Sequence, residues 1–184
     1  MGKFSLGLIV GLVIFPLLVI AYLMGGFAPA AATAPPVPFE RFIAGTALHE
    51  RIEREAPKRD ASSFTADDLA DGADVYKKYC AMCHGALSQP APVIAKGMFP
   101  EAPQLLTPDG MVTDDPVGET YWKVKNGIRL SGMPSFASSL MEKQMWDVSA
   151  LLARANNLPP GAQRELQVAV EPSTKTPDDN TPKK

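Results

Sequence analysis

The feature that most constrains this chain is the pentapeptide Cys80-Ala81-Met82-Cys83-His84. It contains both cysteines and one of the two histidines among 184 residues. A disulfide framework is excluded beyond a single bridge, and a bridge across so short a loop would tie no distant segments together. The two thiols and the imidazole must therefore be considered as one chemical site.

The C-x-x-C-H spacing is that of covalent c-type haem attachment. A helical turn would bring the thiols of Cys80 and Cys83 to the two vinyl groups of one porphyrin, and the imidazole of His84 would reach the iron from one side. Two other uses remain open. A redox dithiol follows a strand in a βαβ unit, and no strand pattern precedes Cys80. A zinc site would add His49, but the adjacent Cys83 and His84 fit awkwardly on one tetrahedron.

Composition excludes several classes of protein. The chain has a formal net charge of −2 and is 46% hydrophobic, so it is neither a polybasic nucleic-acid binder nor an acidic disordered chain. The domain that remains once the two ends are set aside is small, and small domains gain much from an internal staple. A large apolar cofactor linked to the chain would provide one.

An uncharged apolar run occupies residues 6–24. A helix of this length spans roughly 28 Å, close to the thickness of one hydrocarbon core. We therefore expect residues 1–27 to be a transmembrane anchor, with a signal peptide as the alternative, although signal apolar regions are typically about 7 to 15 residues long. Lys3 is the only charge before the run, and this bias puts the N-terminus in the cytoplasm.

Residues 28–64 are expected to be a spacer on the far side of the membrane. Residues 28–38 are rich in Ala and Pro, which is typical of a semi-rigid extended segment. Residues 39–55 have the pattern of a short helix, with opposite charges four positions apart. The spacer would separate the anchor from the domain that carries the C-x-x-C-H motif.

The domain begins with a well-marked helix start. Thr65 is the expected N-cap, Asp68 completes a capping box, and Phe64 and Leu69 form a hydrophobic staple. The apolar face of this helix leads directly into the C-x-x-C-H turn. Gly72 costs about 1 kcal/mol relative to Ala inside a helix, and it predicts the close approach of another helix.

Two further helices are predicted after a long Pro-rich loop. The second begins with Asp115 as N-cap before Pro116 and ends at Gly127. The third begins at Ser139, with Glu142 in a second capping box, and ends before Pro159. The inward-facing residues are expected to be Val117, Tyr121 and Val124 in the second helix and Met141, Met145, Val148, Leu152 and Ala155 in the third.

This pattern predicts an all-α protein. The domain would span residues 65–158, and no strand pattern appears in the sequence. The polar, Pro-rich residues 159–184 are expected to form a disordered tail.

Three helices, long loops and one C-x-x-C-H motif resemble the class I cytochrome c family over residues 65–158, in a membrane-anchored bacterial form. The resemblance implies an all-α fold around one covalent haem c, and the apolar run at residues 6–24 adds one transmembrane helix before it. With the charge bias at Lys3, we expect a single-pass protein of the bacterial inner membrane with the haem domain in the periplasm. In this family a proline carbonyl accepts the Nδ1–H of the proximal histidine, and a leucine packs on the porphyrin. Pro103-Gln104-Leu105 is similar to that element, so Pro103 would orient His84.

The loop between the second and third predicted helices resembles the family's G-M-P loop. It gives Met133 as the distal iron ligand, opposite His84. Gly132 would let the chain approach the metal, and Pro134 would stiffen the exit of the loop. The alternative is a Met133 that fills a gap in the core.

Other assignments near the haem rest on weaker signals. Met98 and His49 are lesser alternatives for the distal ligand, and Met82 is excluded because it lies inside the attachment turn. Three residues could contact the porphyrin or its propionates, or equally be ordinary packing or surface residues: Tyr121, Trp122 and Arg129. Basic residues flank the predicted haem segments and could steer an acidic partner: Lys77, Lys78, Lys96, Lys123, Lys125 and Arg129.

These residues predict an electron carrier rather than an enzyme. With His84 and Met133 both on the iron, no coordination position is left for a substrate, so one-electron transfer remains. The expected partners are a redox-protein donor and acceptor in membrane complexes, reached from the inner membrane through residues 6–24. Nucleic acid is not expected. The alternatives are a permanently bound cytochrome subunit of a larger oxidoreductase complex, and a sensor or catalytic haem in which Met133 does not bind.

Overall fold

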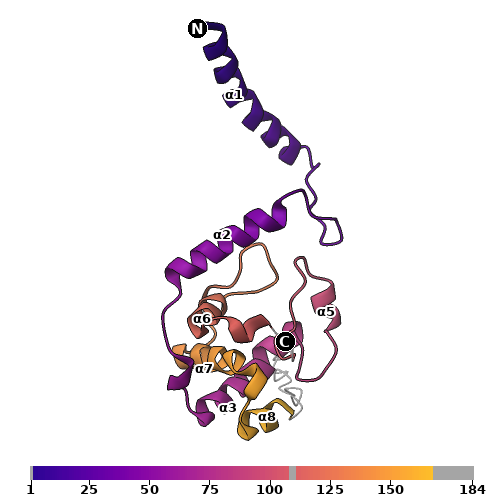
Figure 1. The fold of residues 1–184 in the computed structure, drawn as a ribbon. Helices are drawn as coiled ribbons and strands as arrows, with labels where there is room; N and C mark the ends of the chain where they lie inside the picture. Colours follow the sequence, from indigo (N-terminus) through magenta and orange to yellow (C-terminus); the bar gives the residue numbers. More distant parts are fainter. Residues whose placement is uncertain (1, 108–110, 168–184) are drawn as a thin grey trace, which may run out of the picture. The chain divides into compact units, whose positions relative to one another are not determined.

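Helices make up all of the regular secondary structure in residues 2–107 and 111–167, which the computed structural model describes (Figure 1). The chain divides into two compact units, Met1–Leu48 and His49–Lys184. The elements in chain order are α1 (Gly2–Met24), α2 (Glu40–Glu55), η1 (Ala61–Ser63), α3 (Ala66–Val75), η2 (Tyr76–Cys80), α4 (Ala81–His84), α5 (Val93–Lys96), η3 (Met111–Asp114), α6 (Val117–Asn126), α7 (Glu142–Ala153), η4 (Ala155–Asn157) and α8 (Pro160–Gln167).

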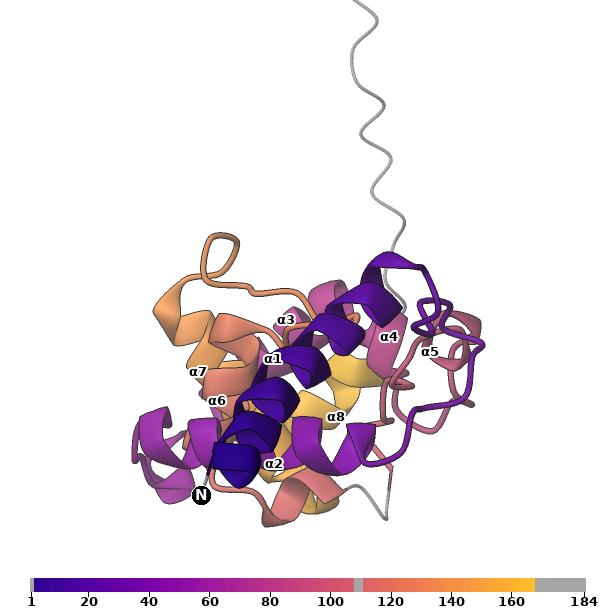
Figure 2. The ribbon, with the colours of Figure 1, turned by 90° about the horizontal axis from the view of Figure 1, so that it is seen from above.

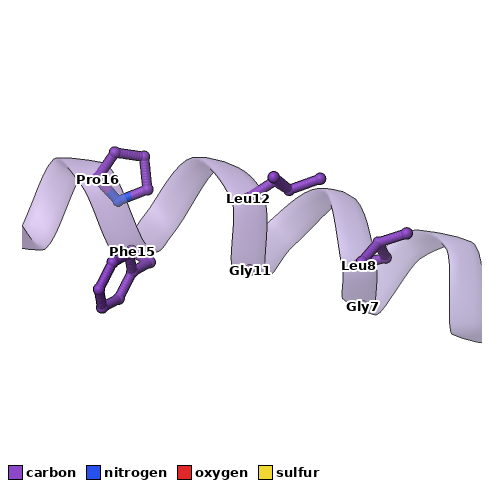
Figure 3. A pocket seen from close by; sticks show the side chains of 6 residues that line it. All are labelled: Gly7, Leu8, Gly11, Leu12, Phe15 and Pro16. Carbon is purple, nitrogen blue, oxygen red and sulfur yellow. The ribbon is translucent and has the colours of Figure 1, made fainter. Parts of the chain in front are cut away.

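Helix α1 has the length and composition of a membrane-spanning helix. Its stretch Gly7–Met24 has a mean hydropathy of 2.7 over 18 residues, and none of it is buried. Figure 3 shows a shallow hollow on this helix, lined by Gly7, Leu8, Gly11, Leu12, Phe15 and Pro16. The exposed apolar surface of α1 fits membrane anchoring, because lipid would cover side chains that the protein itself leaves uncovered.

The segment before the predicted domain packs more closely than a spacer would. Helix α2 forms within the predicted range, and the indole of Trp122 donates to Glu55 at its end over 3.0 Å. A Cβ added to Gly118 would lie 1.7 Å from the backbone oxygen of Pro57. Arg154 donates to the Ala61 carbonyl at 2.9 Å. Residues 55–64 therefore belong to the second unit's packed surface, which begins before residue 65.

Helix α3 begins as its sequence predicts. The backbone N–H of Asp68 donates to Thr65 Oγ1 at 3.2 Å, and Asp68 Oδ2 accepts from the backbone N–H of Thr65 at 2.9 Å. These hydrogen bonds, led by the one from the Thr65 backbone, lower the pKa of Asp68 to about 2. Phe64 and Leu69 of the predicted staple are both buried.

Helix α3 packs against α7, and α7 lies beside α6 (Figure 1, Figure 2). Gly72 is the point of closest approach between α3 and α7. Gly72 meets the backbone of α7 at Asp147, whose carboxylate is buried. Lys143 sits one turn earlier on α7 and pairs with Asp68, Asp71 and Asp147 at 3.0, 3.1 and 2.8 Å. Burial raises the pKa of Asp147, and the hydrogen bond to Lys143 opposes that shift. The crossing thus combines backbone contact with a charge cluster around one lysine.

Two predicted helix starts are wrong. Helix α6 begins after Pro116, and Asp115 instead pairs with Lys123 at 2.7 Å. Helix α7 begins at Glu142 rather than near Ser139, because residues 136–140 form a turn in which the Phe136 carbonyl accepts from the N–H groups of Ser139 and Leu140. The Gln144 side chain then accepts from the N–H of Met141 at 2.9 Å. Met141 is largely exposed, and Ala155 lies beyond the helix in η4.

The predicted disordered tail also needs correction, because residues 160–167 form helix α8. Ala162 and Leu166 of α8 are buried, and α8 packs on α3. Glu165 pairs with Lys77 of η2. The rest of the predicted tail, residues 168–184, lies outside the described residues. Within the Pro-rich loop, expected to be without helix, α5 and η3 each form one short turn.

Replacing Gly72 with alanine should destabilise the second unit by about 1–3 kcal/mol, the usual effect of overpacking a close contact. A Cβ at this position would lie 2.3 Å from the backbone oxygen of Asp147, where no flexible side chain can yield. Denaturant unfolding of the haem-loaded protein would measure the loss. Gly45→Ala in α2 is the control, since nothing lies within 4 Å of the added atom. An unchanged unfolding midpoint for Gly72→Ala would contradict the crossing.

Candidate functional site

The attachment turn stands at the end of α3, where the helix widens into one π-helical turn. The N–H of Ala81 donates to the Tyr76 carbonyl across this turn, η2, and α4 then carries the chain to His84. Cys80 and Cys83 are half-buried and do not form a disulfide. A regular helix would have continued the direction of α3. The π turn instead rotates the two thiols relative to the apolar face of α3.

Tyr76 hydrogen-bonds to the backbone at the end of this turn. Its ring is fully buried, and its hydroxyl donates to the Gly85 carbonyl at 2.7 Å and lies 3.3 Å from the His84 carbonyl. Gly85 has a φ of +80°, which favours glycine and lets the chain leave α4 sharply. By its spacing from Leu69, Tyr76 lies on the apolar face of the helix before the C-x-x-C-H turn, and this alone indicates only a core residue. A buried tyrosine needs a hydrogen-bond partner for its hydroxyl. That requirement was the signal that Tyr76 also holds the backbone after the turn, at Gly85.

The imidazole of His84 is oriented by Pro103. Nδ1 of His84 lies 2.7 Å from the Pro103 carbonyl, which can only accept, so Nδ1 carries the hydrogen and Nε2 has its lone pair available. Burial lowers the pKa of His84, an effect that the Pro103 hydrogen bond opposes. The neutral imidazole is the form that binds a metal. The pairing of Pro103 with His84 is the one that the resemblance to class I cytochromes implies.

The two other uses of the cysteines find no support. Burial raises the pKa of the Cys80 thiol to about 12, whereas reactive dithiols have a lowered thiol pKa. No group of three or more His, Cys, Asp and Glu side chains gathers as a metal site would require, in the part of the chain that the structure describes. The four residues considered for zinc are therefore not assembled.

Met133 lies in a loop, residues 127–136, that is tied at both ends to α6. Gly127 has a φ of +68°, and a Cβ there would lie 2.6 Å from the backbone nitrogen of Ser135. Ser135 Oγ donates to the Lys125 carbonyl at 2.6 Å, and the N–H of Phe136 donates to the Val124 carbonyl at 3.1 Å. Met133 is thereby held on a short, closed loop. Its side chain is half-buried against the core.

Segments far apart in sequence meet around the attachment turn. Phe136, at the end of the Met133 loop, packs edge-on against Tyr79 of η2 with ring centroids 6.3 Å apart. Several apolar residues of the turn and the loops are half-buried against the core, among them Cys80, Leu87, Leu105, Val112, Met133 and Phe136. An apolar group held by the cysteines would cover more of such side chains than water does, which is favourable.

The three residues considered as contacts of the porphyrin or its propionates lie elsewhere in the domain. Tyr121 is buried and stacked on Trp146 at 4.0 Å, with its hydroxyl 3.4 Å from Glu142. Trp122 donates to Glu55, and Arg129 is exposed. None of the three is brought to the attachment turn by a contact that the described residues show. Of the basic residues expected to steer a partner, Lys77, Lys78 and Lys123 each pair with an acidic side chain.

Residues 67–152 match the family model described as cytochrome C oxidase, cbb3-type, subunit III. Comparison with curated proteins and with solved structures gave no significant match. The matched span runs from the first turn of α3 almost to the end of α7 and contains both cysteines, His84 and Met133. Residues 67–152 therefore form a cytochrome c domain, which implies covalently attached haem c, and the chain serves electron transport as a carrier or as a subunit of a larger protein.

Proposed function

We propose that the protein is a membrane-tethered cytochrome that carries single electrons between respiratory or dehydrogenase complexes in the periplasm. Its haem would be attached through Cys80 and Cys83, and His84 and Met133 would be the two iron ligands. Haem c supplies a metal that cycles between Fe(II) and Fe(III). The chain is not expected to be an enzyme, because both axial positions would be occupied.

The observation that carries this proposal is the 2.7 Å hydrogen bond between His84 Nδ1 and the Pro103 carbonyl. It fixes the tautomer that exposes Nε2, and it does so directly after two half-buried thiols that have no disulfide. A histidine that only packed in the core would not need its other nitrogen left available. Proximal ligands of this kind have their orientation and basicity set by such an acceptor.

Met133 supports carrier rather than substrate chemistry. Its loop is closed by Gly127 and Ser135, and the Met133 side chain is half-buried against the core, so water would be kept from the thioether. A thioether ligand favours the reduced metal and raises its potential. Such a site suits delivery of electrons to a high-potential acceptor.

The apolar helix α1 supports a tether in the inner membrane. Anchoring keeps a carrier at high effective concentration near its partners, so each encounter can be weak and brief. The alternative is a fixed subunit of an oxidoreductase complex. The match to a family described as an oxidase subunit favours that alternative specifically.

Membranes that contain the full chain would test the proposal. On addition of a respiratory substrate, the haem c absorbance should show reduction, followed by reoxidation when oxygen is admitted. After extraction in mild detergent the protein should elute as a monomer. A constant ratio to other oxidase subunits through purification would favour the fixed subunit. Haem that never changed redox state in these membranes would overturn both forms of the proposal.

A further inference from the structure

The tip of the Met133 loop relies on bonds within itself. The N–H and the hydroxyl of Ser131 both donate to the Ile128 carbonyl, and the N–H of Met133 donates to Ser131 Oγ at 3.1 Å. The N–H of Ile128 donates to the Met133 carbonyl at 3.2 Å. Leu130 has a φ of +60° and is 93% exposed. Such a tip is locally ordered, but these bonds do not attach it to the rest of the domain.

A side chain from a distant segment covers this tip at Gly132. A Cβ built on Gly132 would lie 2.7 Å from Met98 Sδ, 3.1 Å from its Cε and 3.4 Å from its Cγ. The thioether of Met98 therefore occupies the space that any other residue at position 132 would need. Gly132 was expected to let the chain approach the metal. In the structure, the absence of a side chain at this position also leaves room for the Met98 thioether.

Met98 is itself held in place. It follows α5 directly, and its N–H donates to the Ala95 carbonyl at 3.1 Å. Ala95 is fully buried, so this short helix is fastened to the domain. Met98 is half-buried. It thus links a fastened segment of the Pro-rich loop to the residue that immediately precedes Met133.

We propose that Met98 is a positioning residue that keeps the Met133 loop closed, and with it the thioether of Met133 on the haem iron. This proposal rests on the proposed ligation by Met133. A flexible, polarisable thioether suits the role, because it fills an irregular gap against a glycine backbone without demanding one geometry. Without this contact the loop opens more often and Met133 leaves the metal more often.

Loop opening can be measured with imidazole as an external ligand. Imidazole binds the ferric metal only where Met133 has left, so its apparent Kd is the intrinsic Kd divided by the fraction of open loop. Met98→Ala should lower the apparent Kd about tenfold in the full-length, haem-loaded protein. Met98→Leu, which restores the apolar volume, should return it to within about twofold of the parent.

Two further variants make the test specific. Met141→Ala removes a methionine that is 68% exposed at the start of α7, and it should leave the apparent Kd unchanged. Gly132→Ala should lower the apparent Kd, because its Cβ would displace the Met98 thioether. In the Met98→Ala background the same change should have little further effect, since contacting residues are non-additive.

The possible results separate this inference from the proposed ligand. An apparent Kd that Met98→Ala leaves unchanged, or that Met98→Leu lowers as much as Met98→Ala does, would overturn the positioning role. If Met133→Ala keeps the sulfur-to-iron charge-transfer band and Met98→Ala abolishes it, Met98 is the ligand and both proposals fail. A variant that does not incorporate haem is replaced in the titration by Gly132→Ala, which reaches the same contact from the other side.

Discussion

Replacing Cys80 and Cys83 together with serine abolishes covalent haem attachment. A serine hydroxyl does not form the thioether, and His84 alone would not retain haem in denaturant. Half-buried apolar residues such as Leu105, Met133 and Phe136 would then lack the haem that is expected to cover them. Because small domains depend strongly on an internal staple, we expect a large loss of folded protein as well. Haem staining after denaturing electrophoresis measures attachment, and far-ultraviolet circular dichroism measures folding.

Met82→Ala is the matched control for this experiment. Met82 lies between the two cysteines but is 69% exposed, so its side chain contributes little to the turn. This variant should bind haem as the parent chain does. Haem that stayed with the double-serine chain through denaturation would sink the attachment assignment and, with it, the proposed function.

The second large effect is expected from Met133→Ala. Loss of the thioether should remove the sulfur-to-iron charge-transfer band of the oxidised protein. The midpoint potential should fall on the order of 0.1 V or more, because axial ligands set haem potentials over a range of about 0.8 V. Truncating the half-buried side chain should also cost stability, about 2 kcal/mol. Optical spectra and a potentiometric titration measure the two electronic effects.

Met133→His separates ligand loss from ligand exchange. A second imidazole should lower the potential, because it does not favour Fe(II) as a thioether does. It should nevertheless leave no open position, so added imidazole should bind far more weakly than in Met133→Ala. If Met133→Ala instead retained the band and the potential of the parent, the distal ligand would have to be another residue.

Local signals in the sequence were sufficient where a structure is built from neighbours in the chain. The capping box at Thr65 and Asp68 depends on residues three apart, and both of its hydrogen bonds form. The stop of α6 at Gly127 depends on one positive φ. Gly72 predicted a close helix approach, although only the structure shows that Asp147 is what it meets.

Local signals failed where a partner elsewhere decides the outcome. Ser139 is a good N-cap by type, but the Phe136 carbonyl accepts its N–H in a turn, so the N-cap of α7 is Met141, two residues later. Residues 160–167 are polar on average, and their apolar face consists of little more than Ala162 and Leu166. So small a face stabilises a helix only when a surface such as α3 is present to cover it.

The sequence by itself determined the attachment turn, because two thiols and an imidazole within five residues leave few chemical uses. It also determined the all-α character of the domain. The family resemblance already implied the Pro103 carbonyl at His84, and the structure shows this pair 2.7 Å apart. Only the tertiary structure decided two other contacts between distant segments, Phe136 with Tyr79 and Met98 with Gly132. The physical reason is that spacing along a helix fixes neighbours within a turn or two, whereas contacts between loops depend on how the whole core packs.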